Sequence, residues 1–263
     1  MKKKVEYEAE EYTSGGHKYT KIPTLKLTQD NKVEITSVEK KVTLQSITPN
    51  AEENIVEIAR VSSSRKDKKA KPEGLLNYLI KNKHFSPFEH GYLTLEIETS
   101  KAIGIQLIRH RSFTFQEFSQ RYQDVSNMDT MFEYVEVRKQ CEDNRQSSSE
   151  VFSPEWEEDI WGGIHDGEAY VQNANEAIRE HLESAKSLYR TLIAAGVARE
   201  QARMILPMCT KTKIFMTGSI RSWIHFFEIR DDEHAQKEIR LIAKQGKEIF
   251  KGELPIISKA LGY

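Results

Sequence analysis

Residues 106–121 combine side chains that could bind an anion. Gln106, Arg109 and His110 stand three and four residues apart, so on a helix they would share one face. Arg111 and Arg121 bracket the segment that follows. With His110 protonated, four cations would lie within thirteen residues. Guanidinium groups bind phosphate oxygens in a bidentate manner, so this stretch predicts a site for an anion with more than one phosphate.

Two other interpretations of this stretch stay open. An arginine-rich segment is most often an exposed basic surface, although the interleaved Phe113, Phe115 and Phe118 favour a more ordered setting. The same residues could form a nucleic-acid-binding module, with arginines on phosphates and phenylalanines stacked on bases. The 39 basic and 40 acidic residues give a net charge of −1, which argues against a nucleic-acid partner.

A second group of candidate residues lies in residues 203–234. Arg203 is flanked by apolar residues at 202 and 204–206, which predicts a largely buried helix in which an arginine needs an anion. Arg221, His225 and Glu228 follow at i, i+4 and i+7 and would share another helix face. For each of these three taken alone, a surface salt bridge is the simplest explanation.

Hydrophobic periodicity predicts the elements that position these residues. Leu93, Leu95 and Ile97 alternate with polar residues and predict one buried strand face. Strands are expected over 41–48, 91–99 and 210–217; helices over 51–60, from Pro72 onward, and over 100–109, 168–195, 199–206, 219–229 and 232–250; a structured loop over 112–122. The predicted fold class is α+β, rich in helices, with a central, mostly antiparallel sheet.

Local signals mark where the expected elements begin and end. Asn50, with Glu53 three residues later, and Ser100 are the expected helix N-caps. Gly196 is expected to end a helix, and Gly162-Gly163 to form a turn within an irregular stretch over 126–165.

The 263 residues suit one large domain with additions. Residues 1–40 are polar and are expected to form a peripheral extension, while 41–263 form the main domain with an insertion at about 138–165. Two cysteines, Cys141 and Cys209, and the lack of a long apolar run or leader indicate a reduced cytoplasmic compartment and no membrane partner. His84, Glu89 and His90 fit no common zinc spacing, so no metal site is expected.

One motif makes a family resemblance visible. Arg109-His110-Arg111, seven residues and then Ser119 resemble the RHRx7S signature of the flavin-dependent thymidylate synthases, the ThyX family. Further segments match the family in order and approximate spacing: 59–62, 84–90, 196–200, 202–207, 221–222, 230 and 234–236. The resemblance covers about residues 42–250.

The resemblance implies an activity. Members of this family make dTMP from dUMP with the methylene group of 5,10-methylenetetrahydrofolate, use FAD reduced by NADPH, and release tetrahydrofolate. They need no cysteine nucleophile, and they are homotetramers whose sites are shared between subunits. A third alternative is a flavoprotein of the same fold without synthase activity, which would bind the yellow cofactor without turnover.

The resemblance also implies site residues. FAD would contact Ser86, Arg109, His110, Arg111, Glu117, Ser219, Arg221 and His225. The nucleotide dUMP would contact Gln106, Arg109, Glu117, Ser119, Gln120, Arg121, Arg203 and Arg230. Arg230 is the expected catalytic residue, since its fixed charge beside the uracil ring would favour ionisation at N3. Ser119 is expected to hydrogen-bond the nucleotide rather than attack it. Ser219, Gln120 and His225 depart from residues common in the family.

Overall fold

A computed structural model describes residues 10–14, 17–21, 23–27, 33–37, 41–62, 71–127, 131–133, 136–142, 144–145, 148–151, 161–165, 168–172 and 174–263. The strands are β1 (Glu10–Ser14), β2 (His17–Lys21), β3 (Pro23–Leu27), β4 (Val33–Ser37), β5 (Val42–Ile47), β6 (Tyr92–Ser100), β7 (Phe113–Glu117), β8 (Arg138–Gln140), β9 (Ser148–Val151), β10 (Trp161–His165), β11 (Glu168–Gln172) and β12 (Lys211–Ser219). The α-helices are α1 (Ala51–Ala59), α2 (Pro72–Lys81), α3 (Lys101–Leu107), α4 (Ala174–Ala194), α5 (Arg199–Ala202), α6 (Ile220–Arg230), α7 (Lys237–Glu253) and α8 (Pro255–Leu261). Short 3-10 turns are η1 (Arg60–Ser62), η2 (Ser86–His90), η3 (Val125–Asn127) and η4 (Arg203–Ile205).

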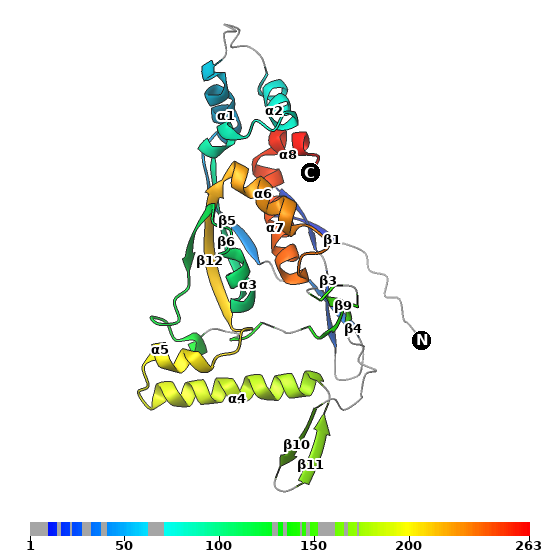
Figure 1. The fold of residues 1–263 in the computed structure, drawn as a ribbon, viewed down its shortest axis with the longest axis vertical. Coiled ribbons are helices and arrows are strands. Elements are labelled where there is room, and N and C mark those ends of the chain that lie inside the picture. Colours follow the sequence, from blue (N-terminus) through cyan, green and yellow to red (C-terminus); the bar gives the residue numbers. More distant parts are fainter. Residues whose placement is uncertain are drawn as a thin grey trace.

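A four-stranded antiparallel sheet in the order β5-β6-β12-β7 organises the site, which confirms the predicted α+β class. Helices α3, α6 and α7 lie on one side of this sheet (Figure 1). Leu93, Leu95 and Ile97 are buried on that side, as predicted. On the other side, Lys213 forms cross-strand ion pairs with Glu96 and Glu98. One face of the sheet is therefore the core, and the other is polar.

Strand β7 corrects the loop expected over 112–122. Phe113 and Phe115 alternate with exposed Thr114 and Gln116, and Phe113 is buried in the core. The period-two pattern was present in the sequence, but pairing with β12 is what makes it a strand, because a five-residue alternation is too short to decide alone. Since Phe113, Phe115 and Phe118 pack into the two hydrophobic clusters, they are not the base-stacking surface that the nucleic-acid alternative requires.

Phe113 packs across Gly218 of β12. A Cβ placed on Gly218 would lie 2.4 Å from the Phe113 ring, and that ring meets Trp223 of α6 edge-on with centroids 4.9 Å apart. The Trp223 indole donates to the backbone oxygen of Leu93 at 2.9 Å. Glycine at 218 therefore allows α6 to be fixed on the sheet through two aromatic rings.

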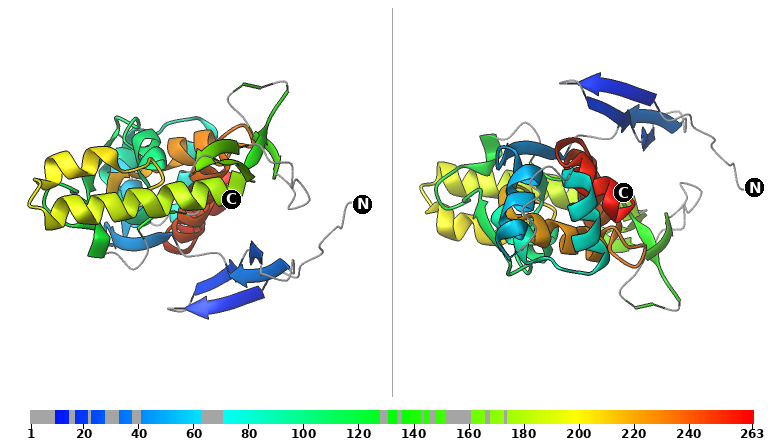
Figure 2. Two further views of the ribbon diagram at one scale, coloured as in Figure 1. Left: turned by 90° about the horizontal axis from the view of Figure 1, so that it is seen from below. Right: turned by 90° about the horizontal axis from the view of Figure 1, so that it is seen from above.

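A second, smaller cluster joins α4 to α5 and η3. It consists of Val125, Met131, Tyr189 and Ala202 with partly buried neighbours. Helix α4 lies beside α5 at one end of the molecule (Figures 1 and 2). Of its described side chains, only Ala185 and Tyr189 are buried, so most of the described part of this 21-residue helix is not covered by other described residues.

Several predicted boundaries were wrong. The helix expected from 168 begins at Ala174, because residues 168–172 pair with β10, and the Gly162-Gly163 pair lies in that hairpin rather than in a turn. Gly196 has a φ of +85°, as a C-terminal cap requires. The helix expected from 232 begins at Lys237, and α8 follows it. Strand β1 pairs with β2, and β3 with β4, both antiparallel.

Asn50 and Ser100 stand at the N-cap positions of α1 and α3, as predicted, but neither side chain makes a cap hydrogen bond. The backbone of Asn50 is left-handed, with φ of 50°, which accounts for its missing cap bond. Ser219 does cap α6, because its hydroxyl accepts the Ser222 amide at 3.2 Å. Within the described residues, no helix is both long and apolar enough to cross a bilayer.

Candidate functional site

His110 and Arg230 meet where α6 ends. Arg230 donates its Nε–H to Nε2 of His110 at 2.9 Å. Burial, then the positive charges of Arg230 and His225, lower the pKa of His110 to about 4. The imidazole is thus neutral at pH 7, with Nε2 as acceptor and the proton on Nδ1. His110 is therefore not one of the four cations considered from the sequence, because it shares a half-buried space with a guanidinium.

Four arginines of the predicted site have no carboxylate partner within the described part of the chain: Arg109, Arg111, Arg203 and Arg230. Burial and the neighbouring charge of Arg109 lower the pKa of Arg230. Like charges held this close favour an anion between them. The arrangement fits a phosphate-bearing ligand.

A turn after β7 contains Ser119, Gln120 and Arg121. The backbone carbonyl of Ser119 accepts hydrogen bonds from the backbone amides of residues 122 and 123. Gln120 is buried, and its Nε2 has no hydrogen-bond partner in the described chain; the same holds for Nε of Arg203. Arg121 is exposed and forms a 3.4 Å ion pair with Glu200. Two unpartnered donors and a weakly held guanidinium suit a ligand rich in oxygen acceptors. The expectation that residues 204–206 are buried was wrong, since Met204 is 75% exposed.

Glu89 organises the start of α6. It accepts the Ser219 hydroxyl at 2.6 Å and the Arg221 guanidinium at 3.0 Å. Ser86 is exposed in the same 3-10 turn, η2. His225 is exposed one turn further along α6 and lies 3.8 Å from Glu228. This group offers hydroxyl, guanidinium and imidazole donors on one surface.

Glu117 is separated from that group. Its Oε1 accepts hydrogen bonds from Lys101 and Thr212, both at 2.8 Å. In the β7–β12 ladder Phe113 pairs with Gly218 and Glu117 with Ile214, so about 14 Å of strand, at ~3.4 Å per residue, separates Glu117 from Gly218, two residues before α6 begins. The predicted FAD residues therefore fall into two groups at different positions along β12.

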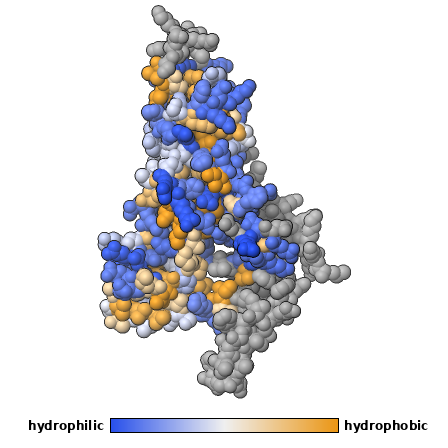
Figure 3. Space-filling view, viewed as in Figure 1, coloured by the Kyte–Doolittle hydropathy of each residue, from blue (hydrophilic) through white to orange (hydrophobic). Residues whose placement is uncertain are grey.

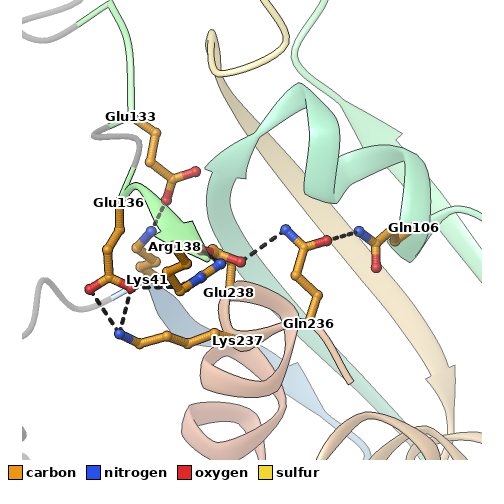
Figure 4. Close-up of polar contacts among 8 residues, drawn as sticks. All are labelled: Lys41, Gln106, Glu133, Glu136, Arg138, Gln236, Lys237 and Glu238. Carbon is orange, nitrogen blue, oxygen red and sulfur yellow. Dashed lines mark hydrogen bonds and ion pairs between the residues drawn. The ribbon is translucent and has the colours of Figure 1, made fainter. Parts of the chain in front are cut away.

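Sequence reasoning missed three residues of this region. Glu89 and Gln236 lie inside segments that match the family, His84–His90 and 234–236, but neither was given a role. Gln236 accepts a 2.6 Å hydrogen bond from Gln106 (Figure 4). Lys101 carries no sequence signal for its pairing with Glu117, because the contact depends on the turn from β6 into α3.

Together, the antiparallel sheet and its arginines without carboxylate partners define an α+β protein with a candidate anion-binding site. Residues 43–256 match the family described as thymidylate synthase complementing protein. The chain is 41% identical over 214 residues to a probable flavin-dependent thymidylate synthase of Paramecium bursaria Chlorella virus 1, covering 81% of this chain and 91% of the relative. It is 40% identical over 203 residues to the flavin-dependent thymidylate synthase of Synechocystis sp., covering 77% and 86%.

A solved structure is similar as well. The crystal structure of a UMP/dUMP methylase PolB from Streptomyces cacaoi bound with 5-Br dUMP superposes with a TM-score of 0.64 and 25% identity, covering 84% of this chain and 93% of that one. The chain belongs to the thymidylate synthase complementing protein family, the flavin-dependent thymidylate synthases. The resemblance and the fold class expected from the sequence are confirmed.

Proposed function

We propose that this enzyme converts dUMP, 5,10-methylenetetrahydrofolate and NADPH into dTMP, tetrahydrofolate and NADP⁺, with FAD as the bound flavin. The observation that carries the proposal is the set of four arginines without carboxylate partners in the described chain, of which Arg230 contacts a neutral His110 and lies close enough to Arg109 to feel its charge. Bound FAD would supply the hydride, while this chain supplies charge, orientation and exclusion of water.

The proposed FAD contacts are Ser86, Arg109, His110, Arg111, Glu117, Ser219, Arg221 and His225. The proposed dUMP contacts are Gln106, Arg109, Glu117, Ser119, Gln120, Arg121, Arg203 and Arg230. The unpartnered nitrogens of Gln120 and Arg203 support a phosphate position beside the turn after β7.

Arg230 is the proposed catalytic residue. Its Nε is engaged by His110, while its two terminal nitrogens have no partner in the described part of the chain. A guanidinium held in this way keeps its terminal N–H groups available for a uracil carbonyl. Its fixed charge would stabilise negative charge that develops on the ring, and His110 would hold its orientation.

We infer that the active unit is a homotetramer with shared sites. Glu117 lies beside Ile214 and Ser219 ends β12, so the proposed cofactor contacts are spread along this strand, and a second copy would complete the surface around them. Apolar side chains gather at the end formed by α4 and α5, on the lower left in Figure 3. Leu188, Met204 and Met208 are 49–75% exposed there. Light scattering should give about four chain masses, and a Leu188→Glu, Met204→Glu double variant should give smaller species.

Two further parts of the proposal concern organisation. We propose that residues 1–40 are an extension outside the catalytic domain, with an insertion at about 138–165, which accords with a family match over 43–256. We also propose a cytoplasmic location.

Anaerobic turnover tests the proposal. Purified protein with dUMP, methylenetetrahydrofolate, NADPH and FAD should form dTMP, and omission of any one should abolish it. A yellow protein that binds FAD but forms no dTMP would instead be the flavoprotein without synthase activity. Full turnover without any flavin would contradict the proposal outright.

A further inference from the structure

A chain of polar side chains connects Gln106 to the segment that carries β8. Gln106 donates Nε2–H to Oε1 of Gln236 at 2.6 Å, and Gln236 donates Nε2–H to Oε2 of Glu238 at 2.9 Å. Arg138 donates to the other oxygen of Glu238 at 2.6 Å. Figure 4 shows these contacts running in one line from β8 past the start of α7 to α3.

Glu238 gives this line a fixed direction. A carboxylate only accepts hydrogen bonds, so Gln236 must turn its amide nitrogen toward Glu238 and its oxygen toward Gln106. The Gln236 oxygen in turn requires the nitrogen of Gln106. The opposite orientation of either amide would place two acceptors against each other, which removes the usual ambiguity of side-chain amides.

The carboxylate is itself held in the charged state. Burial works against its charge, but its own backbone N–H at the start of α7, the Gln236 amide and Arg138 outweigh burial, so the pKa of Glu238 is lowered. Arg138 is 11% exposed and is held from its other side by Glu136, which also accepts Lys237 at 2.7 Å. The direction of the line is thus set by ion pairs within the chain.

The consequence falls on the free atom of Gln106. Its carbonyl oxygen has no partner among the described residues, and Arg109 follows three residues later in the turn after α3. Resting on the proposed function, in which Gln106 contacts dUMP, we propose that Arg138, Glu238 and Gln236 are positioning residues that hold the Gln106 carbonyl outward. Gln106 then accepts a hydrogen bond from a donor of the nucleotide, either the ribose hydroxyl or the imide N–H.

Nucleotide analogues test this in the FAD-loaded protein. Calorimetry would measure Kd for dUMP, for its 3′-deoxy analogue and for its N3-methyl analogue. In the wild type, one analogue should bind about tenfold more weakly, the loss expected for one buried hydrogen bond. Which analogue binds more weakly shows whether the ribose hydroxyl or the imide N–H is the donor to Gln106. In Gln236→Leu, an exposed position, the same analogue should lose less than about threefold, because the Gln106 amide is free to turn.

Two variants complete the design. Arg138→Met should reduce the analogue penalty in the same direction as Gln236→Leu. Lys237→Gln removes an ion pair to Glu136 but leaves the line to Gln106 intact, so it should keep the wild-type penalty. If the analogue's loss of affinity is unchanged in Gln236→Leu, or if neither analogue binds the wild type more weakly than dUMP, this inference is wrong while the proposed function stands. Wild-type protein that fails to bind dUMP overturns the proposed function, and this inference with it.

Discussion

Arg230 and His110 form a hydrogen bond in which a guanidinium donates to an unprotonated imidazole nitrogen across 2.9 Å. Protonation of Nε2 would remove this acceptor and place two cations in contact. The fold therefore holds His110 neutral, with a pKa of about 4 in place of the ordinary 6.5. This arrangement makes the stability of the protein depend on pH in a defined direction.

Stability should fall as the pH drops from about 6.5 toward 4. In this interval the unfolded chain binds a proton at His110 that the folded chain does not, so the free energy of unfolding rises with pH, by at most about 1.4 kcal/mol per unit. Urea unfolding at pH 5.5 and 7.5 should show a smaller difference for His110→Gln than for the wild type. Gln201→Ala, at an exposed position without a titratable group, is the control and should behave as the wild type. Equal pH dependence in His110→Gln would contradict the assignment.

Arg230→Ala should lower kcat for dTMP formation by about 10²-fold or more, the effect of removing a preorganised donor from developing charge. FAD binding, followed by flavin absorbance, should persist, because other arginines carry the proposed cofactor contacts. Lys259→Ala removes an exposed ion pair with Glu73 and should leave kcat unchanged. Full activity in Arg230→Ala would remove Arg230 from the catalytic role.

The sequence predicted the sheet and the helix faces where periodicity was long. Ile239, Ile242 and Phe250 are buried on α7, as their spacing requires. It failed where tertiary pairing decides: β7 is a strand only beside β12, and residues 168–172 leave the expected helix to pair with β10. Arg109, His110 and Arg230 were chosen from the family motif, but the neutral state of His110 depends on burial beside Arg230, which no local pattern encodes.

Substitutions of Arg203 and Arg121 should weaken nucleotide binding more than a substitution of Glu200. Arg203→Met and Arg121→Met should each weaken dUMP binding about 10- to 100-fold, since a charge-assisted hydrogen bond is worth about 1.5–3 kcal/mol. Glu200→Gln only breaks an exposed 3.4 Å pair, so its Kd should change by less than about fivefold. Equilibrium dialysis with the FAD-loaded protein measures all three. If Glu200→Gln weakened dUMP binding as much as Arg121→Met, the ion pair between Arg121 and Glu200 would account for the loss, and a direct contact of Arg121 with the nucleotide phosphate would be contradicted.

Two glycine substitutions should change stability in opposite directions. Gly218→Ala places a Cβ 2.4 Å from the buried Phe113 ring, which is fixed by Trp223, so unfolding should become easier by about 1–3 kcal/mol. Gly74→Ala, in α2 with no atom within 4 Å of the new Cβ, should stabilise by up to about 1 kcal/mol. Urea unfolding at pH 7.5 measures both. If Gly218→Ala were as stable as the wild type, the ring could move aside, and α6 would not be fixed on the sheet by this contact.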